Sequence, residues 1–287
     1  MADNYTNGSW DSADGLSLNY RDYPARSGSD GVPIVCLHGL TRNARDFADL
    51  AEHLSHDRRV IVPEMRGRGS SDYAPDAATY NPGQYVEDVE RLLDDLGIDR
   101  FVAIGTSLGG LMTMMMGQSN ADRIAGAVLN DIGPEIEAAG LDRIAGYVGQ
   151  GRTYPTWVHA ARSLGEVHGE AFPEYGLDQW LQMAKRLLVV GQSGRITYDY
   201  DMAIAEPFSD PENAAPVDLW TAFTGLRDVP MVLIRGELSD LLSPRTVDRM
   251  KQINPALRVV NVPRVGHAPT LDEPEARAAI DDLLAKV

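Results

Sequence analysis

The sequence predicts an α/β fold: a doubly wound, mostly parallel sheet with a helical segment inserted into it. Short apolar runs alternate with stretches of helical period along most of the 287 residues. One of these runs leads through a glycine-flanked serine into a helix-forming segment. The alternation stops between 134 and 216. We therefore expect a core made of 1–133 and 217–287, with 134–216 forming a helical cap, or lid, over the site.

The first third of the chain contains strands of two kinds. Alternating apolar and polar residues over 15–23 are typical of an edge strand with one solvated face. The uninterrupted apolar run 32–37 indicates a strand buried on both faces, and 60–62 indicates a shorter one. Apolar residues recur at helical spacing over 44–54 and 85–96, which predicts helices.

The central stretch carries the most informative motif. An apolar strand at 101–104 runs into Gly-Thr-Ser-Leu-Gly, and a Leu/Met-rich helical segment follows. Gly105 and Gly109 leave room where strand and helix approach each other closely. Such a turn exposes the Ser107 hydroxyl and places the N–H of Leu108 at a helix N-terminus, where an oxyanion is favoured. The methionines that follow are expected to pack in the core and not to bind metal.

The remaining core elements continue the alternation. The pattern predicts strands at 124–129, 229–234 and 257–262, with a helix starting near Pro244 and a closing helix at 276–284. Strands that alternate with helices imply right-handed crossovers and a parallel sheet.

A His-Gly pair directly follows the strand at 32–37. The glycine lets the loop fold back toward the serine turn, so the N–H of Leu40 is expected to be the second oxyanion donor. His38 would support this loop or line the pocket. The arginine-containing loop 66–70 lacks the ending of a phosphate-binding loop, and we interpret it as structural.

Three loops that follow separate strands present Ser107, Asp240 and His267 at one sheet edge. A serine hydroxyl is a weak nucleophile until a histidine takes its proton, and a carboxylate fixes the histidine tautomer. The order Ser, Asp, His is the one expected on this fold. Asp131 and Glu237 are alternative acids.

The motifs HGLT at 38–41, GTSLGG at 105–110, GELSD at 236–240 and VGHAP at 265–269 resemble those of serine α/β-hydrolases with a helical cap. The resemblance implies Ser107 as nucleophile, Asp240 as acid and His267 as base. It also implies the N–H groups of Leu40 and Leu108 as the oxyanion hole. Epoxide hydrolases and haloalkane dehalogenases carry an aspartate where this chain has Ser107, so the resemblance is to the esterase-like branch.

The function predicted from these residues is hydrolysis of small to medium carboxylic esters through an acyl-enzyme, as in carboxylesterases (EC 3.1.1). Three alternatives remain open: C–C bond hydrolysis of the meta-cleavage-product type, lactone opening, and a ligand-sensing role without fast turnover. The C–C alternative requires a cation for a substrate carboxylate, and Arg42, Arg186 and Arg195 are the candidates.

Within the predicted cap, Trp157, Trp180 and Met183 are expected to line the substrate pocket together with His38. His159 and His168, also in the cap, are expected to have packing or surface roles, as are His53 and His56 in the core. Neither the pocket nor the reaction requires a metal or a cofactor.

The chain carries 26 Lys and Arg against 42 Asp and Glu, a net charge of −16. This excess of negative charge argues against nucleic acid or an anionic membrane as partner, and leaves a small-molecule ester as the expected one. Cys36 is the only cysteine, so no disulfide framework is predicted. The polar N-terminus and the lack of long apolar runs predict a cytoplasmic protein. The sequence leaves open whether it is a monomer or a dimer.

Overall fold

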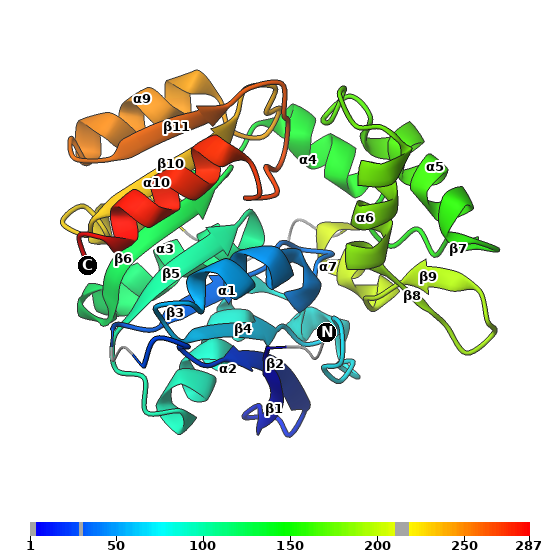
Figure 1. Ribbon diagram of the computed structural model, residues 1–287, viewed down its shortest axis with the longest axis horizontal. Helices are drawn as coiled ribbons and strands as arrows, with labels where there is room; N and C mark the ends of the chain where they lie inside the picture. The colour runs from blue at the N-terminus through cyan, green and yellow to red at the C-terminus, as the bar shows by residue number, and fades with distance from the viewer. Residues whose placement is uncertain (1–3, 29–30, 210–217) are drawn as a thin grey trace.

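The computed structural model describes residues 4–28, 31–209 and 218–287. In these parts of the chain, eight strands form one sheet in the order β1-β2-β4-β3-β5-β6-β10-β11 (Figure 1). All neighbours from β4 to β11 are parallel, whereas β1 and β2 are antiparallel at one edge. The predicted fold class is confirmed.

The bounds of the core elements follow the sequence pattern closely. The strands are β1 (Thr6–Asp11), β2 (Ser17–Tyr23), β3 (Ile34–Leu37), β4 (Val60–Glu64), β5 (Phe101–Thr106), β6 (Ile124–Asn130), β10 (Met231–Gly236) and β11 (Arg258–Val262). The helices are α1 (Ala48–Leu54), α2 (Pro82–Asp95), α3 (Leu108–Asn120), α8 (Leu219–Gly225), α9 (Pro244–Ile253) and α10 (Pro274–Leu284). β1 had no counterpart among the predicted strands because five of its six residues are exposed or half-buried, so it shows no apolar run.

Local chemistry explains where helices begin and end. α2 starts where the Asn81 side chain accepts a hydrogen bond from the N–H of Gln84, with Pro82 at the first helical position. It ends before Gly97, whose φ of +63° is the left-handed conformation that glycine adopts without strain. α9 begins in the same way as α2, with Ser243 as the N-cap and Pro244 at the first helical position.

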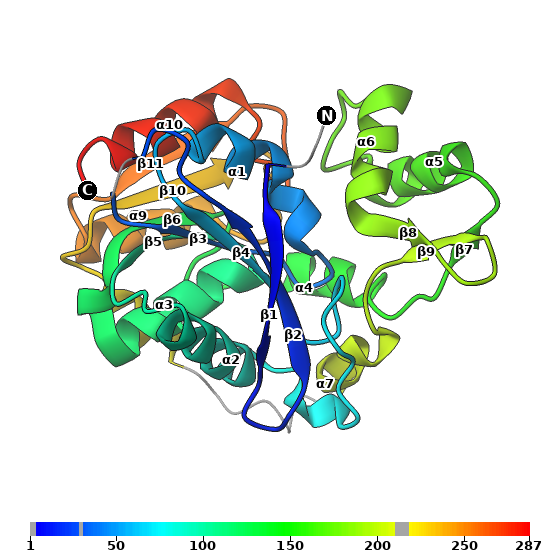
Figure 2. The same ribbon diagram turned by 60° about the horizontal axis from the view of Figure 1, so that its bottom comes forward.

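The sheet is covered on both faces, as Figure 2 shows for α1 and α10 on one side and α2 and α3 on the other. Alternate strand residues supply the two cores. In β3, Val35 and Leu37 pack in the cluster that contains α2 and α3, whereas Ile34 and Cys36 pack in the cluster that contains α1 and α10. All four residues are fully buried, which explains why the strand is apolar without alternation.

The predicted insertion lies between β6 and α8 in the chain and stands to one side of the sheet (Figure 1). Its elements are α4 (Ala138–Ala145), β7 (Thr153–Tyr154), α5 (Trp157–His168), α6 (Leu177–Leu187), β8 (Leu188–Val190), β9 (Ile196–Tyr198) and α7 (Glu206–Ser209). The small sheet β7-β9-β8 was not predicted, because strands of two or three residues are too short to show a period. The predicted end of the insertion, at 216, lies outside the described residues.

Ion pairs join this insertion to the core. Arg186 at the end of α6 contacts Asp49 of α1 at 2.5 Å and Asp272 before α10 at 2.6 Å. Arg45 contacts Asp199 after β9 at 2.7 Å. None of the helices in the described parts of the chain has the length and apolar character of a membrane-spanning helix.

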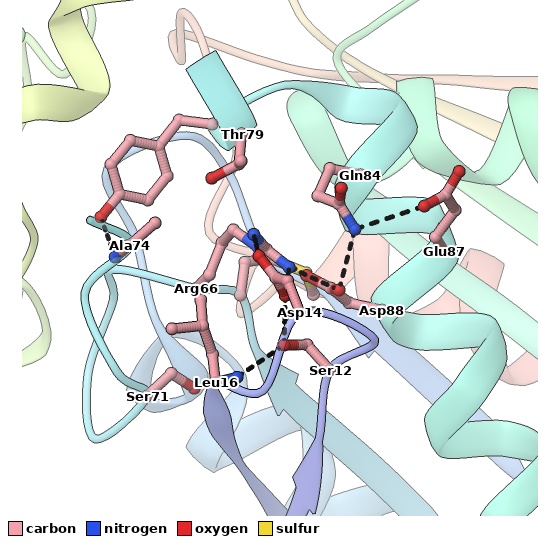
Figure 3. A network of polar contacts seen from close by, with 12 residues as sticks. Ser12, Asp14, Leu16, Arg66, Ser71, Ala74, Thr79, Gln84, Glu87 and Asp88 are labelled. Carbon is pink, nitrogen blue, oxygen red and sulfur yellow. Dashed lines mark hydrogen bonds and ion pairs between the residues drawn. The ribbon is translucent and has the colours of Figure 1, made fainter. Parts of the chain in front are cut away.

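A buried ion-pair network fixes the loop after β4 (Figure 3). Arg66, which is 0% exposed, donates two hydrogen bonds to Asp88 of α2 and two to Asp14 of the β1–β2 turn, all between 2.8 and 2.9 Å. The bonds to Arg66 hold the pKa of the Asp14 carboxyl at about 2, against a small opposing effect of burial. The prediction that loop 66–70 is structural is supported, because its arginines are buried among protein acceptors.

We predict that Asp88→Ala destabilises the fold strongly, because it leaves the buried Arg66 guanidinium with only the half-exposed Asp14 as partner. Removing one partner of a buried pair costs about 3–5 kcal/mol. Urea unfolding followed by circular dichroism measures this loss. The control Asp57→Ala removes a carboxylate that is 73% exposed, so it should change the free energy of unfolding by less than about 0.5 kcal/mol. Equal midpoints for the two variants would contradict the argument.

Candidate active site

The turn between β5 and α3 holds Ser107 in a strained conformation. Its φ of 51° and ψ of −112° lie outside the regions that non-glycine residues prefer. A Cβ on Gly105 would overlap the backbone of Gly109, and one on Gly109 would overlap the carbonyl of Leu37 in β3. Only glycine fits at these two positions, as the sequence predicted, and the tight turn pushes the serine hydroxyl out at the strand end.

His267 lies on the loop after β11 and faces Ser107. Its Nε2 is 3.0 Å from the Ser107 Oγ, and its Nδ1 is 2.8 Å from Oδ2 of Asp131. A carboxylate only accepts, so Nδ1 carries a proton and donates it, which leaves Nε2 as the acceptor for the serine hydroxyl. The predicted pairing of Ser107 with His267 is present in the structure.

Asp131 follows β6 directly and is completely buried. Its Oδ1 accepts a hydrogen bond from the N–H of Gly236 at 2.9 Å, and its Oδ2 accepts from the Ser239 hydroxyl at 2.7 Å as well as from His267. Its φ of 54° is left-handed, a conformation that aspartate tolerates better than most residues. These donors satisfy the carboxylate and aim it at the histidine ring.

The prediction that Asp240 partners His267 is therefore wrong in the structure. Asp240 instead forms a two-pronged ion pair with Arg143 of α4, at 2.5 and 2.9 Å, and its side chain is 34% exposed. Burial raises the pKa of Asp240, but the hydrogen bonds and charge of Arg143 outweigh it and lower that pKa overall. In the same loop the preceding residue, Ser239, contacts Asp131.

The other candidate acid, Glu237, accepts a hydrogen bond from the backbone N–H of Arg264 at 2.7 Å and does not contact His267. Asp131 is one of the alternative acids that the sequence predicts, because it lies at a strand end. The contacts decide between the candidates: Asp131 reaches Nδ1 of His267, whereas the Asp240 carboxylate is held by Arg143.

The loop after β3 lies against the serine. A Cβ on Gly39 would be 3.9 Å from the Ser107 Cβ. The N–H groups of Leu40 and Leu108 donate to no atom of the described chain. Arg68, which sequence reasoning assigned no role at the site, donates from Nε to the carbonyl of Leu40 at 2.9 Å and so holds this peptide in place. No local sequence pattern predicts this contact between two loops that are far apart in the chain.

His38 supports the loop after β3 through two hydrogen bonds. Its Nδ1 lies 2.8 Å from the carbonyl of Gly39, and its Nε2 accepts from the N–H of Met65 at 3.1 Å. Burial lowers the pKa of His38 to about 4, so the ring is neutral and Nδ1 carries the donated proton. His38 is fully buried and is absent from the cavity wall, which corrects its prediction as a pocket residue.

A cavity opens beside Ser107 and His267, with walls from the core and the insertion. It encloses about 80 Å³. Its apolar and aromatic lining comprises Leu40, Phe47, Ile144, Tyr147, Phe172, Leu187, Tyr198, Tyr200, Ala268 and Pro269. Its charged or titratable lining, besides His267, comprises Arg42, Asp46, His168 and Arg186.

Three predicted pocket residues lie elsewhere. Trp180 packs inside the insertion against Phe172 and Tyr175. Trp157 packs against the hydrophobic cluster to which Trp180 belongs. Met183 is buried in the insertion and borders a separate groove beside β11 and α10. Their apolar character reflects the insertion's own core, a use that sequence composition does not distinguish from pocket lining.

Of the remaining histidines, His53 and His56 contact Asp281 and Asp57 at the surface, and His159 contacts Thr156 at the start of α5. His168 differs, because its ring faces the cavity and packs edge-on against Tyr147 with centroids 5.1 Å apart. Burial, with a smaller effect of the Arg42 and Arg143 charges, lowers the pKa of His168 to about 4.

This fold and this site define an α/β hydrolase. Residues 32–274 match the family model described as alpha/beta hydrolase fold, and the chain belongs to that family and is a hydrolase.

One relative is the 3-hydroxybutyrate-oligomer hydrolase of Cupriavidus necator, which is 35% identical over 84% of each chain. A second is the 2-(acetamidomethylene)succinate hydrolase of Mesorhizobium japonicum, 26% identical over 88% of this chain and 85% of that one. Among solved structures, an alpha/beta hydrolase from Novosphingobium aromaticivorans is 55% identical, covers 100% of both chains and has a TM-score of 0.94.

We predict that a fluorophosphonate, which labels activated serines without regard to the natural substrate, modifies Ser107. Asp131→Asn should slow labelling by about 10³–10⁴-fold, because Nδ1 of His267 loses the carboxylate that fixes its tautomer. The measurement is the second-order labelling rate followed by intact-protein mass spectrometry.

Asp240→Asn is the matched control for that experiment. It removes the same charge from the neighbouring loop but leaves the Asp131–His267 contact in place, so labelling should slow by less than about tenfold. A larger effect of Asp240→Asn than of Asp131→Asn would restore Asp240 as the acid.

We further predict that His168 makes the protein less stable in acid. Its pKa is about 4 in the fold and 6.5 in the unfolded chain, so the unfolded state binds the extra proton between these values. This contribution lowers the free energy of unfolding as pH falls from 6.5 to 4 and then levels off. His168→Phe should reduce the slope by up to about one proton in that window. Urea midpoints against pH test this, with exposed His56→Gln as control.

Proposed function

We propose that the protein is a serine hydrolase that cleaves carboxylic esters of small to medium size through an acyl-enzyme. The observation that carries the proposal is the hydrogen-bonded series Ser107, His267 and Asp131, with contacts of 3.0 and 2.8 Å. In this proposal the three side chains act as a catalytic triad, and the insertion acts as a cap over them.

The chemistry follows from the protonation states. His267 Nε2 takes the proton of the Ser107 hydroxyl while the oxygen attacks the ester carbonyl. Asp131 stabilises the imidazolium that forms, and the hydrogen bonds from Gly236 and Ser239 hold its carboxylate in orientation. The alcohol leaves with the proton from His267. Water then attacks the acyl-enzyme by the same route and releases the acid.

The oxyanion of each tetrahedral intermediate would be held by the N–H groups of Leu40 and Leu108. Both groups lack an acceptor in the described chain, and Leu108 adds the positive end of α3. His38 and Arg68 hold the Leu40 loop rigidly against the serine. Donors that are already in place need no reorganisation during reaction, which is the basis of their effect on rate.

The cavity supports small substrates. About 80 Å³ is well below the roughly 300–1,000 Å³ of typical drug-sized sites. The relative from Cupriavidus necator, named as a hydrolase of 3-hydroxybutyrate oligomers, supports an ester bond between short hydroxy acids as one such substrate.

We predict that the wild-type protein hydrolyses p-nitrophenyl esters and that Ser107→Ala lowers kcat by at least about 10³-fold. Because the cavity is small, acetate and butyrate should be better substrates than laurate. The absorbance of the released p-nitrophenol gives the rates. Turnover that survives Ser107→Ala would exclude the mechanism, and the absence of wild-type turnover would favour a ligand-sensing protein.

C–C bond hydrolysis is the second candidate. The specific observation in its favour is Arg42, one of the three cations predicted for a substrate carboxylate, which lines the cavity. Arg195 instead contacts Thr153 in the insertion, and Arg186 is paired with two aspartates. A vinylogous 1,5-diketone acid tests this candidate: faster turnover of that acid than of any ester would replace the esterase proposal.

A further inference from the structure

Arg42 places a cation with spare donors in the cavity beside Ser107. Its Nε donates to Oδ2 of Asp46 at 2.5 Å, and its two Nη groups have no hydrogen-bond acceptor among the described residues. The side chain is 26% exposed and faces the cavity. Because a guanidinium donates along two edges, Asp46 orients the group while the Nη edge stays available.

The other arginines near the site have acceptors already. Arg143 is paired with Asp240, Arg186 with Asp49 and Asp272, and Arg68 donates to backbone carbonyls. Each of these groups serves the fold or the contact between insertion and core. Of the two arginines in the described cavity wall, Arg186 uses its Nη2 for two carboxylates that join the insertion to the core, whereas both Nη groups of Arg42 remain open to a ligand.

Two neutral donors lie next to this guanidinium. His168 and Tyr147 line the same cavity and pack edge-on, and neither ring nitrogen of His168 has a hydrogen-bond partner among the described residues. The Tyr147 hydroxyl oxygen accepts a hydrogen bond from Arg143, which leaves the hydroxyl proton free to donate. The pKa of His168 is about 4, lowered by burial and by Arg42 and Arg143, so the ring is neutral at pH 7. Burial raises the pKa of the Tyr147 hydroxyl, which stays protonated.

The surroundings strengthen any contact with Arg42. Phe47, Ile144, Phe172 and Leu187 make the adjoining walls apolar. Charge-assisted hydrogen bonds to a guanidinium gain strength where water is excluded, and a carboxylate matches the geometry of its Nη edge. A neutral ester group would leave these donors without an acceptor on binding.

The position of Arg42 limits how far the ligand charge is from the reacting bond. A Cβ on Gly39 would lie 3.2 Å from the Arg42 Cγ and 3.9 Å from the Ser107 Cβ. The base of the arginine side chain is therefore one glycine away from the nucleophile. Because the cavity that holds both groups encloses only about 80 Å³, a carboxylate bound by the Nη groups belongs to a short substrate.

We infer that the substrates are short esters that carry a free carboxylate, bound by the Nη edge of Arg42 with His168 and Tyr147 as supporting donors. This inference rests on the proposed esterase function and names its substrate class. An oligoester of a hydroxy acid has such a carboxylate one hydroxy-acid unit from its terminal ester bond.

The test uses the linear dimer of 3-hydroxybutyrate as free acid and the same dimer with a terminal carboxamide. Both contain the same ester bond and differ in the charge at the end. Calorimetric binding to Ser107→Ala, which retains the cavity, is expected to be at least about tenfold tighter for the acid. In the wild type, kcat/KM should favour the acid by a similar factor.

Arg42→Gln tests the assigned residue. It should weaken binding and kcat/KM for the acid at least about tenfold and change those for the amide less than about threefold. Because it leaves Asp46 unpaired, the double variant Arg42→Gln/Asp46→Asn removes both charges and should show the same loss of discrimination. Arg195→Gln removes a cation that contacts Thr153 outside the cavity and should behave as wild type.

Each failure has a distinct signature. Equal affinity for acid and amide, affinity for the acid weaker than about 10 mM, or discrimination that persists in both Arg42 variants would overturn the carboxylate site. If p-nitrophenyl esters are still hydrolysed in that case, the esterase proposal stands alone. If the acid binds through Arg42 but no ester is turned over, the carboxylate site stands and the esterase proposal falls.

Discussion

The geometry of the site depends on the buried carboxylate of Asp131. It accepts hydrogen bonds from the loop after β10, through Gly236 and Ser239, and from the loop after β11, through His267. The ends of three neighbouring parallel strands are thereby held together by one residue. A charge without exposure is tolerated only when its hydrogen bonds are made. The same bonds that satisfy the acid therefore also fix the histidine ring toward Ser107.

Because Asp131 after β6 is the carboxylate that contacts His267, Asp240 in the loop after β10 forms a different contact. Asp240 contacts Arg143 in α4, the first helix of the insertion, and Leu241 packs against Gly140 of the same helix. The insertion leaves the core close to Asp131, so this ion pair anchors it next to the site. Asp240, which the sequence motif predicts to be the acid, thus belongs to the contact between the core and the insertion.

Arginines concentrate around the site although the chain as a whole carries a net charge of −16. Arg45, Arg68, Arg143 and Arg186 each have a protein acceptor and tie loops or the insertion to the core. Arg42 is only partly used, because Asp46 occupies its Nε edge. The other arginines hold loops and the insertion in place around the cavity, whereas the open Nη edge of Arg42 is complementary to an anionic group.

The sequence by itself determined the fold class, the order of the core strands along the chain and the pair Ser107 and His267. These follow from local rules: apolar runs form buried strands, and glycines at 105 and 109 are required wherever a strand and helix meet so closely. It did not determine which of two strand-end aspartates contacts His267, nor which residues of the insertion face the cavity. Asp131 and Asp240 each follow a predicted strand, and only the tertiary contacts show that Asp131 reaches His267 whereas Asp240 pairs with Arg143. Trp157, Trp180 and Met183 are as apolar as a pocket wall, but tertiary packing buries Trp180 and Met183 within the insertion and leaves Phe47, Tyr147 and Tyr198 at the cavity. Those choices depend on contacts between residues far apart in the chain, which no local pattern records.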